Sequence, residues 1–87
     1  MKVYRYPVKV SDSLKLDLPE GARVIHFGED PSGNLSIWAI VNPDSHVEKD
    51  VYSFAVRGTG QPVPALHRHV MTARQGLHMW HLFERLR

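Results

Sequence analysis

The stretch His67–Glu84, which reads HRHVMTARQGLHMWHLFE, decides the fold. Two runs that mix apolar and basic residues flank the pair Gln75-Gly76, and this pattern predicts a β-hairpin. The stretch also contains four of the six histidines and the second of the two tryptophans. It therefore predicts both the closing element of the fold and an electropositive, aromatic face.

Five segments that precede the hairpin have the composition or the alternation of β-strands. Leu35–Val41 is apolar on both faces, which is typical of a central strand. Gly58–Pro64 contains two glycines and two prolines, so it cannot be regular structure. Trp38 and Trp80 are interpreted first as core residues, since aromatic side chains usually anchor packing in small β domains. The five predicted strands are Lys2–Val8, Leu14–Leu18, Val24–Phe27, Leu35–Val41 and Val51–Arg57.

Short strands separated by closely spaced turns predict an all-β fold, either a small sandwich or a partly open barrel of about seven short antiparallel strands. The end of the chain leaves one alternative open, because Met79–Leu86 also has the apolar spacing of a short C-terminal helix. The choice decides whether His78 and His81 converge, as on a helix, or diverge, as on a strand. Asn42–Lys49 is predicted to be a loop with room for one helical turn.

The length predicts one compact domain, residues 1–87, because a chain this short cannot build two independent cores. Folding buries only about 60% of the surface at this size and no cysteine supplies a disulfide, so we expect a homo-oligomer. The lack of cysteine also excludes thiolate zinc sites and iron–sulfur clusters. Neither a signal peptide nor an apolar run of the roughly 20 residues that span a bilayer is visible, which predicts a cytoplasmic protein without a membrane partner.

Charge is unevenly distributed along the chain. Residues 1–50 carry a net charge of −2 and residues 51–87 carry +4, which gives +2 in total. Every cation of the second part is an arginine, whose planar guanidinium suits phosphate and carboxylate groups. The total is too small to indicate a nucleic-acid binder, so a small anionic partner is the prediction. For any single arginine, a solvated basic strand face is an equally good interpretation.

The histidines raise a metal site as an alternative. His67 and His69 lie on one face of an extended segment, because side chains two apart in a strand point the same way. A cupin-like metal site needs an acid soon after this His-x-His pair, and none follows before Glu84. Surface or hydrogen-bonded histidines are therefore the favoured interpretation, and neither a metal ligand nor a cofactor is predicted.

The turn Gly58-Thr59-Gly60 follows a predicted strand, and backbone N–H groups in such turns can converge on an anion. It is not a P-loop, because the Gly-Lys-Ser/Thr ending is missing. Trp80, with arginine and histidine near it in sequence, has the side chains needed to stack a purine and hold its phosphate. No hydrolase motif and no carboxylate pair is visible, so no catalytic residue is predicted. The predicted ligand-binding residues are Arg57, Gly58, Thr59, Arg68, His69, Arg74, Trp80 and His81.

A set of short motifs is spread over nearly the whole chain: Tyr6-Pro7, Leu18-Pro19-Glu20-Gly21-Ala22, His26, Trp38-Ala39, Gly58-Thr59-Gly60 and Trp80-His81-Leu82-Phe83-Glu84. Together they resemble a group of short bacteriophage and prophage proteins of unknown function. The resemblance implies a compact β-rich fold and a phage accessory role in the host cytoplasm, with no established reaction. Some small oligomeric phage proteins sequester nucleotide second messengers of bacterial defence, and the analogy suggests such an anti-defence sponge.

Three functions follow, in order of preference. The first is a non-enzymatic, oligomeric binding module that captures a small anionic ligand, such as a cyclic or ADP-ribose-type nucleotide. The second is a protein–protein inhibitor or structural adaptor whose basic face binds an acidic host protein. The third is a metal enzyme with histidine ligands.

Overall fold

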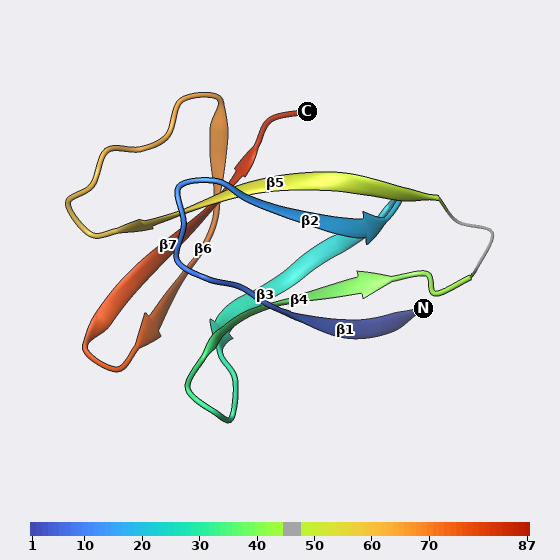
Figure 1. Ribbon diagram of the computed structural model, residues 1–87, viewed down its shortest axis with the longest axis horizontal. Helices are drawn as coiled ribbons and strands as arrows, with labels where there is room; N and C mark the ends of the chain where they lie inside the picture. Colours follow the sequence, from blue (N-terminus) through green and yellow to red (C-terminus); the bar gives the residue numbers. More distant parts are fainter. Residues whose placement is uncertain (45–47) are drawn as a thin grey trace.

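A computed structural model describes residues 1–44 and 48–87 of the chain (Figure 1). The regular structure within these two ranges is entirely β, which confirms the all-β prediction, and they contain no helix that could cross a membrane. Seven strands follow one another in the described part of the chain. They are β1 (Lys2–Pro7), β2 (Leu14–Pro19), β3 (Arg23–Glu29), β4 (Leu35–Val41), β5 (Lys49–Gly58), β6 (His67–Gln75) and β7 (His78–Arg85).

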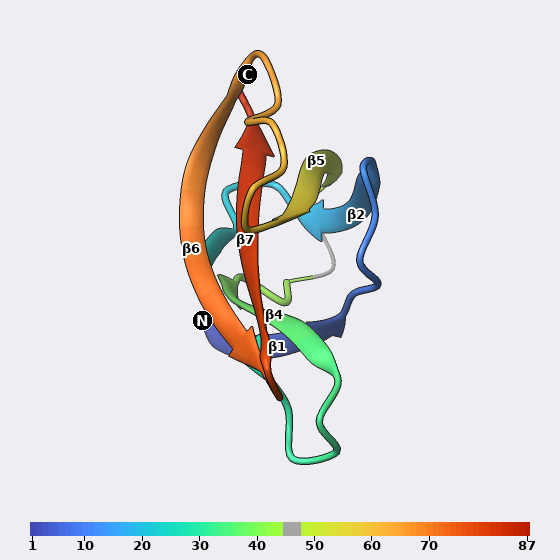
Figure 2. The same cartoon turned by 90° about the vertical axis from the view of Figure 1, so that its left-hand side faces the viewer.

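The strands form two antiparallel sheets that face each other as an open sandwich. One sheet has three strands in the order β1-β4-β3, and the other has four in the order β2-β5-β7-β6. Strand β4, the apolar segment predicted to be central, is the middle strand of the smaller sheet. Figure 2 shows how the larger sheet curves from β6 and β7 towards β5 and β2. The two sheets do not close into a barrel.

The core lies between the two sheets. Successive side chains of a strand point to opposite faces, so every second residue of each strand is directed inward. Leu18, Phe27, Ile37, Phe54 and Leu82 are almost completely buried there. The residues between them project from the outer faces of the sandwich, where some are exposed and others, such as Phe83, are shielded by neighbouring segments.

The two sides of the sandwich differ. On one side β3 packs against β6, and Phe27 donates its backbone N–H to Met71 Sδ at 3.3 Å. The backbone N–H of Gly76 also donates to Glu29 Oε1 at 2.6 Å, across the same side. On the other side, no hydrogen-bonded ladder joins β1 to β2 among the described strands. The sandwich is therefore closed along β3 and β6 and open between β1 and β2.

The hairpin of β6 and β7 replaces the alternative C-terminal helix. Its turn lies at Gly76-Leu77, one residue later than the predicted pair Gln75-Gly76, because Gln75 pairs with His78. Gly76 has φ +57°, as the first central position of a type II′ turn requires. Strand β7 is paired on both edges, with β5 and with β6, and a helix would lose both ladders. His78 and His81 accordingly lie on opposite faces.

The two tryptophans have different surroundings. Trp80 packs against the core, as predicted. Trp38 is on the outer face of the smaller sheet, where its ring centroid is 5.2 Å from that of His26, so the core interpretation of Trp38 is wrong. Ile37 and Ala39, its neighbours in β4, take the inward positions instead. The helical turn predicted within 42–49 falls in part on residues 45–47, outside the described residues.

Candidate functional site

A row of polar side chains crosses the outer face of the larger sheet. Arg57 of β5 is the cross-strand partner of His81 of β7, which is in turn the partner of Thr72 of β6. Val56 and Leu82, their neighbours in sequence, belong to the core. Because side chains alternate along a strand, the row Arg57, His81 and Thr72 must face outward.

His81 is held between two threonine hydroxyls. Its Nε2 lies 2.9 Å from Thr59 Oγ1, and its Nδ1 lies 2.9 Å from Thr72 Oγ1. Thr72 Oγ1 also lies 2.9 Å from Nε2 of His69. These contacts form a continuous hydrogen-bonded chain, Thr59–His81–Thr72–His69, in which each hydroxyl can donate one bond and accept another. We call this chain the relay.

The turn after β5 folds over one end of the relay. Gln61 fixes it, because the Gly58 N–H donates to Gln61 Oε1 at 2.6 Å and the Gln61 N–H donates to the Gly58 carbonyl at 3.2 Å. Gly60 has φ +93°, a backbone conformation that residues with a Cβ rarely adopt. The turn encloses a hollow of about 230 Å³ on the sheet. Its lining residues are Arg57, Gly58, Thr59, Gly60, Gln61, Val63, His81 and Phe83.

Arg57 forms an ion pair at the edge of this hollow. Its Nε donates to the Pro62 carbonyl at 3.2 Å, which anchors the guanidinium below the turn. Its Nη1 donates to Asp12 Oδ1 at 2.7 Å. The Arg57 side chain is 18% exposed, whereas that of Asp12 is 89% exposed. A largely buried cation therefore meets an anion that is almost fully in solvent.

Phe83, two residues beyond His81 in β7, packs against the His69 ring of the relay. Phe83 is on the outer face but is only 8% exposed. The ring of His69 meets the ring of Phe83 edge-on, with 5.5 Å between the centroids. The buried Phe83 ring forms an apolar floor of the hollow, whereas the His69 ring is exposed.

Five of the eight predicted ligand-binding residues therefore lie together. Arg57, Gly58 and Thr59 come from β5 and its turn, and His69 and His81 come from the hairpin. Arg74 lies on the same outer face, two positions along β6 from Thr72, and is exposed. It extends the basic surface without lining the hollow.

Trp80 and Arg68 are placed elsewhere. Trp80 is on the inner face of β7, where its Nε1 donates to Gln75 Oε1 at 3.0 Å and its ring lies close to Gly58. Arg68 donates to Glu84 Oε1 at 2.6 Å and lines a separate hollow beside β3. Since Trp80 and His81 are adjacent in a strand, they face opposite sides of the sheet and cannot grip one ligand together.

The model for a domain of unknown function, DUF7352, matches residues 1–87 of the chain. The chain belongs to this family. Comparisons with curated proteins and with solved structures find no match. The family description names neither a reaction nor a source, so the resemblance of the motifs to phage proteins stays a prediction.

In this DUF7352 domain the sequence did not predict Gln61, Val63 and Phe83 as lining residues of the site, nor the contacts of Thr72 and Asp12. Thr72 would have been paired with His81 if the hairpin turn had been placed at Gly76-Leu77, since a two-residue turn fixes the register. Asp12 lies 45 positions from Arg57, and no local pattern predicts that contact. Thr72 was thus missed through an error of register, and Asp12 because its contact with Arg57 is long-range.

Among the described residues, the histidines do not assemble into a metal site. The ring centroids of His69 and His81 are 6.5 Å apart, but both rings are already bonded to Thr72. Across residues 1–44 and 48–87, no three histidine or carboxylate side chains come close enough together to hold a metal ion. The described part of the chain thus gives the metal hypothesis no third ligand.

Proposed function

We propose that the protein is a non-enzymatic binding module whose hollow beside Arg57 and His81 captures a small anionic, phosphate-bearing ligand of the nucleotide type. The observation that supports this proposal most strongly is the ion pair between Arg57 and Asp12. The Asp12 carboxylate marks a position where an anion is already favoured, and its exposure leaves room for another anion to replace it.

The exchange is energetically accessible. Ion pairs that are open to solvent contribute about 0–1 kcal/mol, because water screens them and the side chains lose freedom. A phosphate offers several charged acceptor oxygens in place of one carboxylate oxygen, and charge-assisted bonds from a guanidinium are among the stronger hydrogen bonds in proteins. Arg57 uses two of its N–H groups in the free protein, so three of the roughly five that a guanidinium carries remain for a ligand.

The relay supplies a further donor. If each group donates towards the hollow, His69 donates to Thr72, Thr72 to His81, and His81 Nε2 to Thr59. The hydroxyl proton of Thr59 is then free to bond a ligand oxygen, which completes the chain. Every member of the relay keeps its hydrogen-bond partner in this arrangement. The Thr59 hydroxyl can therefore donate to a bound anion without leaving any other group of the relay unpaired.

The size of the hollow limits what can enter it. Ligand pockets for whole small molecules are typically about 300–1,000 Å³, so 230 Å³ suits a phosphate group better than an entire nucleotide. We place the base on the open sheet beside the exposed His69 ring, not on Trp80, which faces inward. A cyclic or ADP-ribose-type nucleotide held by several copies of the chain would fit the predicted role of a phage accessory protein that sequesters a defence signal.

Isothermal titration at constant ionic strength tests the proposal, with inorganic phosphate, a cyclic dinucleotide and ADP-ribose as probes. Arg57→Gln should weaken binding about 10- to 100-fold, because it removes hydrogen bonds to a charged group. Asp12→Asn should tighten binding, because it removes the competing carboxylate. Arg23→Gln removes the same charge from the smaller sheet and should leave affinity unchanged. Absence of binding by all three probes, or equal losses in Arg57→Gln and Arg23→Gln, would refute the site.

A further inference from the structure

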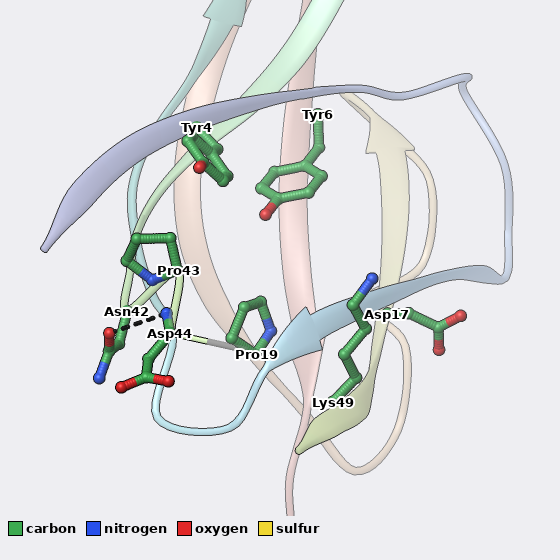
Figure 3. Close-up of a pocket in the computed structure, with 8 residues that line it drawn as sticks. All are labelled: Tyr4, Tyr6, Asp17, Pro19, Asn42, Pro43, Asp44 and Lys49. Carbon is green, nitrogen blue, oxygen red and sulfur yellow. Dashed lines mark hydrogen bonds between the residues drawn. The ribbon is translucent and has the colours of Figure 1, made fainter. Parts of the chain in front are cut away.

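The open side of the sandwich contains a second cavity. It has a volume of about 390 Å³ and lies between β1, the end of β2 and the start of β5 (Figure 3). Figure 3 shows the rings of Tyr4 and Tyr6 projecting from β1 on the side where Pro43 and Pro19 lie. The cavity is lined by Tyr4, Tyr6, Asp17, Pro19, Asn42, Pro43, Asp44 and Lys49.

Three of the side chains around this cavity, Tyr4, Tyr6 and Lys49, can donate hydrogen bonds to a ligand. Within residues 1–44 and 48–87, neither the Tyr4 nor the Tyr6 hydroxyl makes a hydrogen bond. Partial burial, and secondarily the neighbouring Tyr4, raises the pKa of Tyr6 above its ordinary value of 10.0, so its phenol keeps its proton at neutral pH. Lys49 extends from the start of β5 towards β1 and adds an ammonium group.

The acceptors at the rim are turned away or occupied. The carboxylates of Asp17 and Asp44 point away from the two tyrosine rings in Figure 3. Asn42 Oδ1 already accepts the backbone N–H of Asp44 at 3.1 Å. The remaining wall is apolar, formed by the tyrosine rings together with Pro19 and Pro43. A ligand that brings acceptors and an apolar body therefore complements this cavity.

A polyproline II segment has this combination of properties. Its backbone carbonyls are solvated and free of internal hydrogen bonds, and each proline lacks the N–H that would need an acceptor. Its pyrrolidine rings pack against aromatic side chains, which is how grooves lined by aromatic residues recognise such segments. We propose that the cavity between β1 and β2 is a docking site for a proline-rich, extended segment of a partner protein, with Tyr4 and Tyr6 donating to its carbonyls.

This site is independent of the proposed anion site. Lys49 begins β5 and Gly58 ends it, so the two sites lie at opposite ends of a ten-residue strand, about 30 Å apart at roughly 3.3 Å per residue. The two cavities share no lining residue. Failure of one site would leave the other unaffected.

Fluorescence anisotropy with a labelled decaproline peptide tests the docking site, and a Gly-Ser peptide of equal length is the reference ligand. Decaproline should bind more tightly than the reference. Tyr6→Phe should weaken that binding about 2- to 10-fold and the double variant Tyr4→Phe, Tyr6→Phe further, since each loses one donated hydrogen bond. Tyr52→Phe, which changes the third tyrosine of the chain, should bind like the wild type because Tyr52 does not line the cavity.

Three results would overturn the docking site. The first result is that the two peptides bind equally well or that neither binds. The second is that the double variant retains full affinity while ¹H–¹⁵N spectra show that it is folded. The third result is a shift of the Tyr4, Tyr6 and Lys49 amide signals as the protein concentration rises in the absence of peptide. Such a shift would assign the cavity to a second copy of this chain.

Discussion

The cavities at the two ends of β5 differ in whether their polar side chains are already bonded within the protein. At the Gly58 end, the side chains around the hollow already bond to one another through the relay and through the pair of Arg57 with Asp12. At the Lys49 end, the hydroxyls of Tyr4 and Tyr6 project into the cavity with no partner in the described part of the chain. The polar groups of the first site are bonded within the fold, whereas the two tyrosine hydroxyls of the second are not, although the Tyr6 ring packs against the core.

This difference has a physical consequence for mutation. Removing a group that is bonded in the free protein changes both stability and binding. Removing a group that makes no hydrogen bond in the folded protein should change binding alone, because no bond that stabilises the fold is lost. Substitutions at the two ends should therefore separate into two classes, and the following predictions test that separation from the largest effect to the smallest.

The largest contrast is expected between two aromatic truncations. Phe83→Ala should lower the free energy of unfolding by about 3 kcal/mol or more, because Phe83 is 8% exposed and its removal leaves a cavity. Tyr4→Ala should cost less than about 1 kcal/mol, because Tyr4 is 42% exposed. Urea unfolding measures both. Equal losses would show that the open side is as tightly packed as the floor of the anion site.

A smaller contrast is expected between two hydroxyl deletions. Thr72→Val removes the group that joins the two imidazoles and should cost about 0.5–1 kcal/mol, as well as weakening phosphate binding. Tyr6→Phe removes a hydroxyl that is unbonded in the described residues, so it should leave the free energy of unfolding unchanged. Thermal unfolding in parallel with phosphate titration checks both values. A stable Thr72→Val variant with full phosphate affinity would mean that the relay has no role.

A contrast that depends on pH is expected at Asp30, which ties β1 to the turn between β3 and β4. Burial by itself raises the pKa of Asp30, but hydrogen bonds from the backbone of Asn34 and Ser32, the charge of Arg5 and the Ser36 hydroxyl together lower it below 3.8. Arg5 Nη1 donates to Asp30 Oδ2 at 2.6 Å. Asp30→Asn keeps an acceptor oxygen for the backbone N–H groups of Ser32 and Asn34, but it replaces Oδ2 by an amide nitrogen, so Arg5 loses both the charge and the acceptor.

The pH dependence of this contact has a definite sign. Because the folded pKa of Asp30 is lowered, its contribution to stability is present above the unfolded pKa near 3.8 and is lost as the pH falls through the folded pKa. Wild-type protein should therefore lose stability on acidification more steeply than Asp30→Asn. Urea unfolding of both proteins between pH 2 and pH 6 measures this, and parallel curves would contradict the role of Asp30.

The sequence predicted most elements of the fold, but it left strand or helix open for the segment that forms β7. Alternation in Leu14–Leu18 and Val51–Arg57 and the doubly apolar run Leu35–Val41 predicted strands that the structure contains. It did not predict which strands share a sheet. The assignment of β1 to β4 and of β2 to β5 depends on long-range pairing, which no local pattern encodes.

The candidate site was predictable in its composition and less so in its geometry. Arg57, Thr59 and His81 were chosen for their chemistry, and strand pairing brings them together. Trp80 was chosen for the same reason, but strand alternation turns it inward, where it fills the core. The inward direction of Tyr4 and Tyr6 follows from their alternation in β1, but the cavity they line depends on the separation of β1 from β2.

The most direct test of the anion site is a ¹H–¹⁵N titration of the protein with inorganic phosphate at constant ionic strength. We predict saturable shifts of the Arg57 Nε–H and of the amides of residues 58–61 and His81, a lower midpoint in Asp12→Asn, and no change at Tyr6 or Lys49. Shifts spread over all arginines in proportion to their exposure, or no saturable shift at Arg57, would contradict the account.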